Sequence, residues 1–188
     1  TIGDALRRYR ATGDPAAGST APRSAGNGCI MRLAPVALFF APDEDRVARH
    51  AAESCVTTHR APECLEAAGL LGRILTRALA GESKQDVLRA RTGASSPELK
   101  VAAIENGGYR AKPESEIRGS GYVIDCLEAA LWCFARTETF EAAVLMAANL
   151  GDDADTTAAV CGQVAGAFYG ESGVPARWLE RLTWVDRI

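Results

Sequence analysis

The sequence predicts an all-α protein that forms a single compact multi-helix domain over residues 1–188. Every strong hydrophobic period along the chain is close to 3.6 residues, the repeat of an α-helix. No segment alternates apolar and polar residues in the manner of a half-buried strand. With 188 residues, 47% of them apolar, the chain is long enough to build one hydrophobic core.

Two helices and a long loop are predicted in the N-terminal part. Residues 2–12 carry apolar side chains at helical spacing, so we expect a short helix there. Residues 15–27 are rich in Pro, Gly, Ser and Ala, and a loop of this length inside a domain is usually functional or disordered. Residues 29–40 are apolar apart from Arg32 and contain Pro35, so we expect a buried, kinked helix.

The middle of the chain predicts two longer helices followed by a less periodic stretch. Asp43 is placed to cap a helix that ends near His59. Pro62 is placed to open a second helix, which has leucines on its inner face and which Gly81 closes. Beyond Gly81 the sequence predicts short helices and then a polar loop, at residues 84–91, 97–105 and 106–121.

The C-terminal third predicts three apolar helices and a shorter terminal one. They cover residues 123–135, 137–150 and 153–169, with Pro175 opening the last helix, which carries Trp178, Leu182 and Trp184. In the third of these helices a small residue recurs every four positions, at Ala158, Gly162, Gly166 and Gly170. Each glycine inside a helix costs about 1 kcal/mol, so we expect this stripe to let a neighbouring helix approach closely.

Composition and charge exclude several classes of function. The net charge of −3 with scattered arginines does not indicate binding to nucleic acid or to an anionic membrane. No apolar run approaches the roughly 20 residues of a membrane span, and residues 1–4 do not resemble a leader, so we expect a cytoplasmic protein. The six cysteines contain no C-x-x-C pair, which favours buried reduced thiols over a zinc site or disulfides. The sequence does not indicate an oligomeric state.

The densest group of chemically active residues is Gly151–Thr157, with three carboxylates and two hydroxyls at the start of a helix. Asp153 and Asp155 would point about 200° apart on a regular helix, so they can share an ion only if Asp153 lies in the turn or at the N-cap. Thr156 would then add a hydroxyl oxygen, and such an all-oxygen set suits Mg²⁺ or Mn²⁺. The alternative is that these aspartates only cap the helix and complement its dipole.

Three other features are candidates, each with a structural alternative. The junction around Asn27 could present backbone N–H groups to a phosphate, or it could be an ordinary Asn-Gly turn. His59 lies at the seam between two predicted helices, where a histidine is often only a capping or structural residue. Tyr122 follows a Gly-Ser-Gly segment and could stack on a flat ring or belong to the core.

The order of these motifs resembles the ADP-ribosylglycohydrolase family. The resemblance extends over nearly the whole chain and is closest to the bacterial branch that removes ADP-ribose from arginine, typified by dinitrogenase reductase-activating glycohydrolase. The segments that carry it are SAGNGCIMRLAP at 24–35, Thr58, His59 and Pro62, GYV at 121–123, ALW at 130–132, NLGDDADT at 149–156 and AAVCGQVAGAFYG at 158–170.

The resemblance implies an all-helical hydrolase that uses two Mg²⁺ or Mn²⁺ ions to cleave the N-glycosidic bond between ADP-ribose and an arginine guanidinium of a modified protein. By position, Asp153, Asp155 and Thr156 match metal ligands of the family. The loop that meets the ribose and diphosphate corresponds to Gly26, Asn27, Gly28 and Cys29, although the family often has Ser or Gly where Cys29 stands. His59 matches the histidine next to the substrate ribose, and Tyr122 the residue near the adenine.

The chain departs from the family in one respect. The family's Gly-Asp-Ala-Leu-Gly and Thr-Asp-Asp motifs, which supply the other metal ligands and the acid/base carboxylate, are absent here. Residues 2–6 resemble the first motif, but Arg7 stands where glycine is needed. We therefore expect the C-terminal two-thirds or so of a hydrolase, with half of a two-metal site, little activity alone and the general acid/base elsewhere. The alternatives are a module that binds ADP-ribose or a nucleotide without cleaving it, and a purely structural helical scaffold.

Overall fold

The computed structural model describes residues 1–95 and 97–184, which confirm the all-α prediction. Within these ranges there is no strand, and the only β-pairing consists of two isolated bridges. The α-helices are α1 Ile2–Thr12, α2 Gly28–Met31, α3 Ala34–Phe40, α4 Glu44–Val56, α5 Pro62–Leu79, α6 Lys84–Val87, α7 Leu99–Glu105, α8 Val123–Arg136, α9 Phe140–Asn149, α10 Ala154–Tyr169 and α11 Ala176–Leu179. Short 3-10 turns lie at Pro22–Ser24, Gly108–Ala111, Glu114–Glu116 and Glu171–Gly173.

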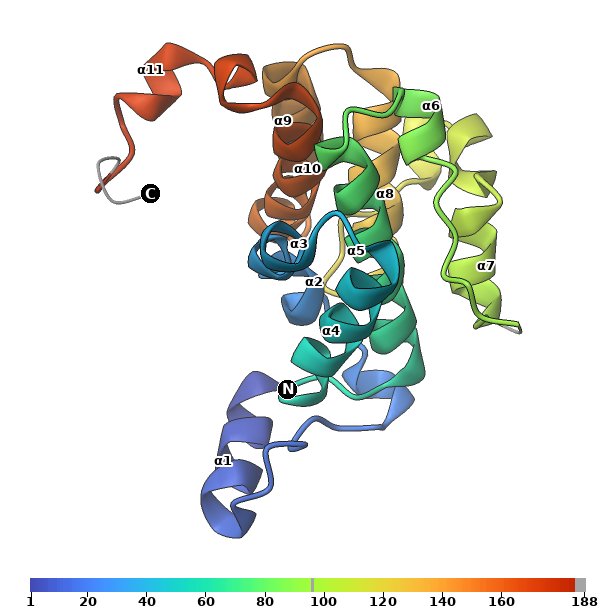
Figure 1. Ribbon diagram of the computed structural model, residues 1–188, viewed down its shortest axis with the longest axis vertical. Coiled ribbons are helices and arrows are strands. Elements are labelled where there is room, and N and C mark those ends of the chain that lie inside the picture. The colour runs from blue at the N-terminus through green and yellow to red at the C-terminus, as the bar shows by residue number, and fades with distance from the viewer. Residues whose placement is uncertain (96, 185–188) are drawn as a thin grey trace.

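The core lies among α5, α8 and α10, each of which contacts the other two (Figure 1). Helix α4 packs on α5, and α9 packs on α10. Ten of the 14 residues of α8 are buried, as expected for a helix that is apolar on nearly all faces. In Figure 1, α1 and α11 project from opposite ends of this body, and α1 buries only Ala5.

Two glycines of the α10 stripe lie beside α9. A Cβ atom added to Gly162 would lie 3.7 Å from Val144 Cγ2, and one added to Gly166 would lie 3.7 Å from a ring carbon of Phe140. These are ordinary packing distances, so α9 packs on this side of α10, but the expectation that the stripe needs glycine for a close helix approach is not confirmed.

The prediction of a single buried, kinked helix over residues 29–40 is wrong. Helix α2 ends at Met31 and α3 begins at Ala34, with Pro35 in its first turn, where the missing N–H breaks no helical hydrogen bond. Leu38 is 66% exposed and Phe39 is 80% exposed, so only one side of α3 is buried.

Two other helices are shorter than predicted. The helix expected over 84–91 covers only Lys84–Val87, and the terminal helix covers only Ala176–Leu179. Leu182 and Trp184 lie beyond α11 and are exposed. Apolar spacing favours a helix mainly where a neighbouring element covers the apolar face. Helix α11 lies at one end of the molecule, where Trp178 contacts Phe140 of α9, and none of its residues is buried (Figure 1).

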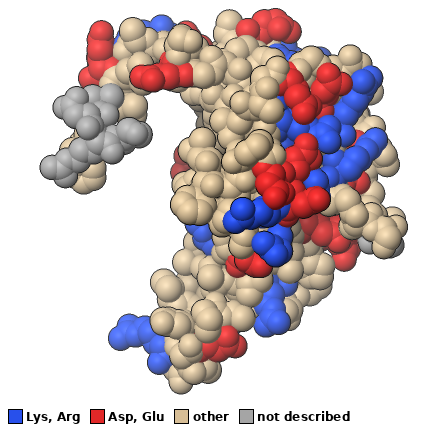
Figure 2. Space-filling model, viewed as in Figure 1, with Lys and Arg blue, Asp and Glu red and all other residues tan. Residues whose placement is uncertain are grey.

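The cysteines and the charged surface match the sequence-based expectation. All six cysteines are free and buried. Lys/Arg and Asp/Glu side chains are interleaved on the face shown in Figure 2, and Arg73 and Arg77 of α5 both pair with Glu44 of α4. None of the described helices is long and apolar enough to cross a membrane.

Candidate functional site

Two helix starts that are far apart in the sequence meet through Asn27 and Asp153. Asn27 is the N-cap of α2 and is 8% exposed, and Asp153 is the N-cap of α10. The Asn27 Nδ2 group donates to Asp153 Oδ2 at 2.7 Å. This hydrogen bond is the largest cause that lowers the pKa of Asp153. The side chain of Asp153 makes no capping hydrogen bond with α10, so capping does not explain this residue.

The segment 119–122 joins these two helix starts. The Asn27 backbone N–H donates to Gly121 O at 3.1 Å, and the Asp153 N–H donates to Gly119 O at 2.8 Å. The side chain of Asn27 also donates to Ser120 O at 3.3 Å. Position 119 is crowded, because a Cβ atom there would lie 3.0 Å from Thr157 Oγ1 and 3.3 Å from the Gly151 carbonyl oxygen.

The predicted metal ligands lie in the first turn of α10 and just before it. Asp153 occupies the N-cap, which is the position that allows it to converge with Asp155 and Thr156. Thr156 is 7% exposed, and its hydroxyl donates to Asp153 Oδ1 at 3.0 Å. Asp155 is exposed. Carboxylate and hydroxyl oxygens fit a hard cation in kind. Over residues 1–95 and 97–184, however, no three His, Cys, Asp or Glu side chains are grouped closely enough to hold an ion.

His59 is buried beneath the loop of Gly26 and Gly28. It is 2% exposed, and Cβ atoms added to these glycines would lie 3.2 Å from its Nε2 and 3.1 Å from its Cε1, respectively. The backbone N–H of His59 donates to Cys55 O, but the ring caps no helix and instead contacts Thr58 Oγ1 through Nδ1 at 2.8 Å. Burial is the main cause that lowers the pKa of His59.

The side chain of Cys29 points into the core. It is fully buried, and its thiol donates to Gly26 O at 3.7 Å. The thiols of Cys55 and Cys64 donate to Cys64 O and Gly26 O, respectively. The proximity of these two thiols lowers the pKa of Cys29 and raises those of both neighbours. If Cys29 contributes to ligand binding, it does so through its backbone at the start of α2.

Tyr122 is half-buried at the N-cap of α8 and is held by two side chains that the sequence analysis did not single out. Its hydroxyl donates to Glu63 Oε2 at 2.6 Å and accepts from Lys100 Nζ at 2.8 Å. The ammonium group of Lys100 also lies 4.7 Å from the centroid of the Tyr122 ring. Burial, followed by the hydrogen bond to Glu63, raises the pKa of Tyr122 to about 12.

Most of these residues surround one pocket of about 360 Å³. Its lining includes Gly26, Asn27, Gly28, His59, Gly121 and Thr156, together with Thr1, Ile2 and Met31. Cys29, Tyr122, Asp153 and Asp155 do not line it, although Tyr122 pairs with Gly26 by a β-bridge and Asp153 bonds Asn27. The contacts given above therefore join the sequence-predicted residues other than Asp155 into one region around the α2 start.

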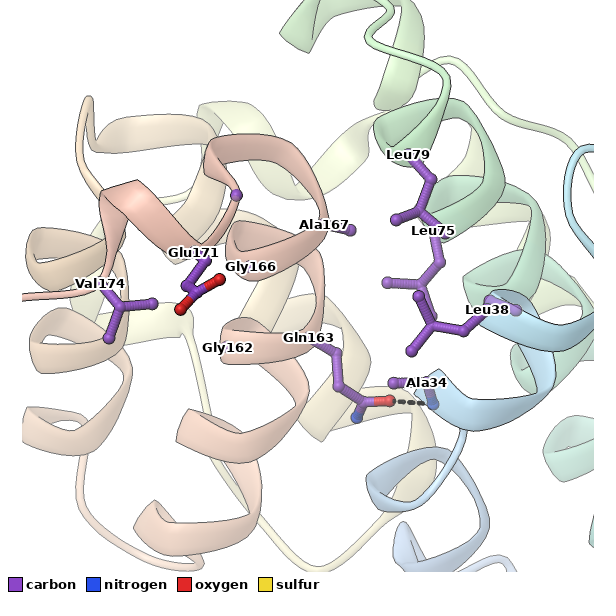
Figure 3. Close-up of a pocket in the computed structure, with 12 residues that line it drawn as sticks. Ala34, Leu38, Leu75, Leu79, Gly162, Gln163, Gly166, Ala167, Glu171 and Val174 are labelled. Carbon is purple, nitrogen blue, oxygen red and sulfur yellow. Dashed lines mark hydrogen bonds between the residues drawn. The ribbon is translucent and has the colours of Figure 1, made fainter. Parts of the chain in front are cut away.

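A larger groove of about 480 Å³ lies elsewhere, between α3, α5 and α10 (Figure 3). Leu38, Leu75 and Leu79 point into it from one side, and Gln163 accepts a hydrogen bond from the Ala34 backbone at its base. Glu171 is its one titratable lining residue. Because binding and proton transfer need convergent polar groups, we assign the functional site to the smaller pocket.

Arg32, Thr58, Glu63 and Lys100 are the site residues that sequence reasoning missed. Arg32 was visible as the lone charge in an apolar run, and Thr58 as the neighbour of His59. Glu63 and Lys100 reach Tyr122 across 59 and 22 residues of sequence, so no local pattern marks them.

Comparison with known proteins places this geometry in a family. A family model described as ADP-ribosylglycohydrolase matches residues 1–188. The chain is 41% identical to the "ADP-ribosylarginine hydrolase Tri1" of Serratia proteamaculans, over 100% of the chain and 51% of that protein. It is 29% identical to the "ADP-ribosyl-[dinitrogen reductase] glycohydrolase" of Rhodospirillum rubrum, over 94% of the chain and 57% of that protein.

A solved structure described as an "ADP-ribosylglycohydrolase-related protein complex" has the same fold. It is 42% identical, with a TM-score of 0.88 over 98% of this chain and 64% of that one. The chain spans about half the length of the curated relatives it matches. With the helix order, the site and these matches taken together, the chain belongs to the ADP-ribosylglycohydrolase family of enzymes.

Proposed function

We propose that this chain is part of a hydrolase that cleaves the N-glycosidic bond between ADP-ribose and the arginine guanidinium of a modified protein. The observation that carries the proposal is the Asn27–Asp153 hydrogen bond, which joins the glycine-rich loop to the acidic helix start. The 41% identity to proteins named ADP-ribosylarginine hydrolase supports arginine as the modified residue.

The loop and the histidine are suited to the ribose and diphosphate of ADP-ribose. The backbone N–H groups of Gly28 and Cys29 have no acceptor among the described residues, so they are available to diphosphate oxygens. His59 faces the same pocket and offers a ring nitrogen to a ribose or phosphate oxygen. In this proposal Tyr122, which pairs with Gly26 of the loop by a β-bridge, contacts the adenine ring.

The acids at the start of α10 would hold Mg²⁺ or Mn²⁺. Asp153, Asp155 and Thr156 supply oxygen ligands of the kind these ions prefer, and they number fewer than a two-ion site needs. When bound, the cations would orient the ribose hydroxyls and stabilise developing charge. The hydrogen bond from Asn27 keeps Asp153 ionised and fixes its orientation.

In the proposed reaction, water adds to the anomeric carbon and the bond from that carbon to the guanidinium nitrogen breaks. The leaving group departs as a neutral guanidine and takes up the proton that the attacking water loses, so the products are ADP-ribose and the guanidinium of unmodified arginine. Asp153 and Asp155, the described acids of the site, are assigned to the cation in this proposal, so neither is assigned as the general base. We therefore place the acid/base carboxylate outside residues 1–188, in agreement with the chain's match to about half of its relatives.

The test combines hydrolysis with binding. We expect the 188-residue chain to bind ADP-ribose in a calorimetric titration with Mg²⁺ present, and to release little arginine from an ADP-ribosylated guanidine substrate. Turnover at the rate of full-length relatives would contradict the placement of the acid/base group. Failure to bind ADP-ribose at all would contradict the assignment of the pocket.

A second candidate is a module that binds ADP-ribose without hydrolysing it. It is favoured by the lack, in the part of the chain that the structure describes, of any group of three His, Cys, Asp or Glu side chains that could hold an ion. This candidate predicts the same ADP-ribose affinity with Mg²⁺ and with a chelator, whereas the hydrolase predicts tighter binding with Mg²⁺.

A further inference from the structure

The ring of His59 has one nitrogen bound to the protein and one directed to the pocket. Nδ1 lies 2.8 Å from Thr58 Oγ1. Nε2 has no hydrogen-bond partner among the described residues and lies near the loop of Gly26 and Gly28, which lines the pocket. The side chain is 98% buried, so an unpaired polar nitrogen facing a pocket indicates a ligand atom there.

Arg32 also donates to the hydroxyl of Thr58. Its Nη2 donates to Thr58 Oγ1 at 2.8 Å, to Ser54 O at 3.1 Å and to Thr57 Oγ1 at 3.4 Å. A guanidinium group can only donate, so the Thr58 oxygen accepts from it. The neighbouring cation also polarises the hydroxyl, and the only described acceptor for the Thr58 proton is His59 Nδ1.

We propose that Arg32 and Thr58 are positioning residues that fix His59 as the neutral tautomer with its proton on Nε2, ready to donate to an oxygen of the ribose or diphosphate. The inference rests on the proposed function for the identity of the ligand. The direction of the chain of hydrogen bonds, from Arg32 to Thr58 to Nδ1, is a property of the free protein. Neither Arg32 nor Thr58 lines the pocket, so both act through the histidine.

The neutral state of the ring agrees with its surroundings. Burial, and to a smaller extent the charge of Arg32, lowers the pKa of His59. A neutral imidazole offers one donor and one acceptor, whereas an imidazolium would place a second N–H against the Thr58 hydroxyl. The chain of hydrogen bonds therefore needs the neutral ring to be complete.

The test uses ¹⁵N NMR of the histidine ring nitrogens, which is favourable because the chain has only two histidines. The spectrum of His50→Gln assigns the His59 signals. At neutral pH we expect Nε2 to be protonated and Nδ1 to be unprotonated with the shift of a hydrogen-bonded acceptor. In Thr58→Val, Nδ1 should move toward the value of a free acceptor, and ADP-ribose affinity should fall by about tenfold. Thr58→Ser should restore both.

Thr57→Val is the matched control. Thr57 also accepts from Arg32, but its hydroxyl donates to Ser54 O and does not touch His59. It should leave the His59 signals and the ADP-ribose affinity unchanged. The inference is overturned if wild-type His59 carries its proton on Nδ1, or if the Thr57 and Thr58 valine variants behave alike.

The outcomes separate this inference from the proposed function. If the wild-type chain binds ADP-ribose but Thr58→Val binds it equally well, the positioning role fails and the proposed function stands. If no ADP-ribose binds, the proposed function and the ligand part of the inference both fail. In that case the NMR shifts still test the remaining part of the inference, which is the direction of the hydrogen bonds from Arg32 through Thr58 to His59 Nδ1.

Discussion

Asn27 and Asp153 are 126 residues apart in the sequence, and their side chains form a 2.7 Å hydrogen bond. Through this bond the loop before α2 and the acidic turn before α10 become one site. Neither side chain makes a cap hydrogen bond to the backbone of its own helix. The contact between the two helix starts is completed by bonds from Asn27 to Ser120 O and from Thr156 to Asp153.

The first prediction concerns this contact. Asn27→Ala should lower the free energy of unfolding by about 1–2 kcal/mol at pH 7, since it removes a hydrogen bond to a carboxylate. The pKa of Asp153 is lowered in the folded state, so the stability this provides is present above its unfolded pKa and is lost as pH falls through the folded value. The difference between wild type and variant, measured by urea unfolding, should therefore shrink between pH 7 and pH 3.

Asn106→Ala is the control for this series. Asn106 is exposed at the end of α7 and far in sequence from the site. Its effect should be small and independent of pH. If the effect of Asn27→Ala on stability did not depend on pH, the Asn27 amide would not stabilise the ionised form of Asp153.

The second prediction tests the close approach at Gly119. Gly119→Ala should destabilise the fold by about 1–3 kcal/mol, because the new Cβ meets Thr157 Oγ1 at 3.0 Å. Gly3→Ala is the matched control, since its Cβ would meet only the flexible end of Arg7 at 3.6 Å and alanine favours a helix. Thermal unfolding of the two variants should shift in opposite directions.

The third prediction concerns Tyr122. Tyr122→Ala should weaken ADP-ribose binding by about tenfold and leave binding of ribose 5-phosphate unchanged, because base stacking contributes on the order of 1–3 kcal/mol. Tyr9→Ala, on the exposed face of α1, should change neither affinity. An equal loss for both ligands would place Tyr122 away from the adenine.

The fourth prediction separates the backbone of Cys29 from its side chain. Cys29→Ser should cost about 1–3 kcal/mol of stability, because it buries a hydroxyl in an apolar core. ADP-ribose affinity should stay within about twofold of wild type, since the side chain points away from the pocket. Cys133→Ser, in the middle of α8, provides the comparison for a core cysteine distant in sequence.

The sequence predicted most of the fold because its long helices are strongly periodic. Helices α4, α5, α8, α9 and α10 lie where their apolar spacing and capping residues place them. The secondary-structure predictions that were wrong concern segments whose structure depends on packing against neighbouring elements. Pro35 could kink a long helix or start a new one, and the four-residue α11 ends where no periodicity marked an end.

The candidate site was predictable in its composition but not in its connections. The residues of the acidic turn and the glycine-rich loop each belong to a motif that can be read locally. The bonds that join them, such as Asn27 to Asp153 and Tyr122 to Glu63, connect distant segments and depend on helix packing. Thr58 shows the same limit, because Arg32, which donates to its hydroxyl, is 26 residues away in the sequence.

The most direct test of the central claim is the calorimetric affinity of the chain for ADP-ribose with Mn²⁺ and with a chelator, for wild type and Asp153→Asn. If the glycine-rich loop before α2 and the acidic turn before α10 form one site, the binding of the cation and the binding of ADP-ribose are coupled. Mn²⁺ should then tighten ADP-ribose binding by about tenfold in wild type and not in the variant. Equal affinities in all four titrations would contradict the account, because they would show that the two helix starts do not act on the same ligand.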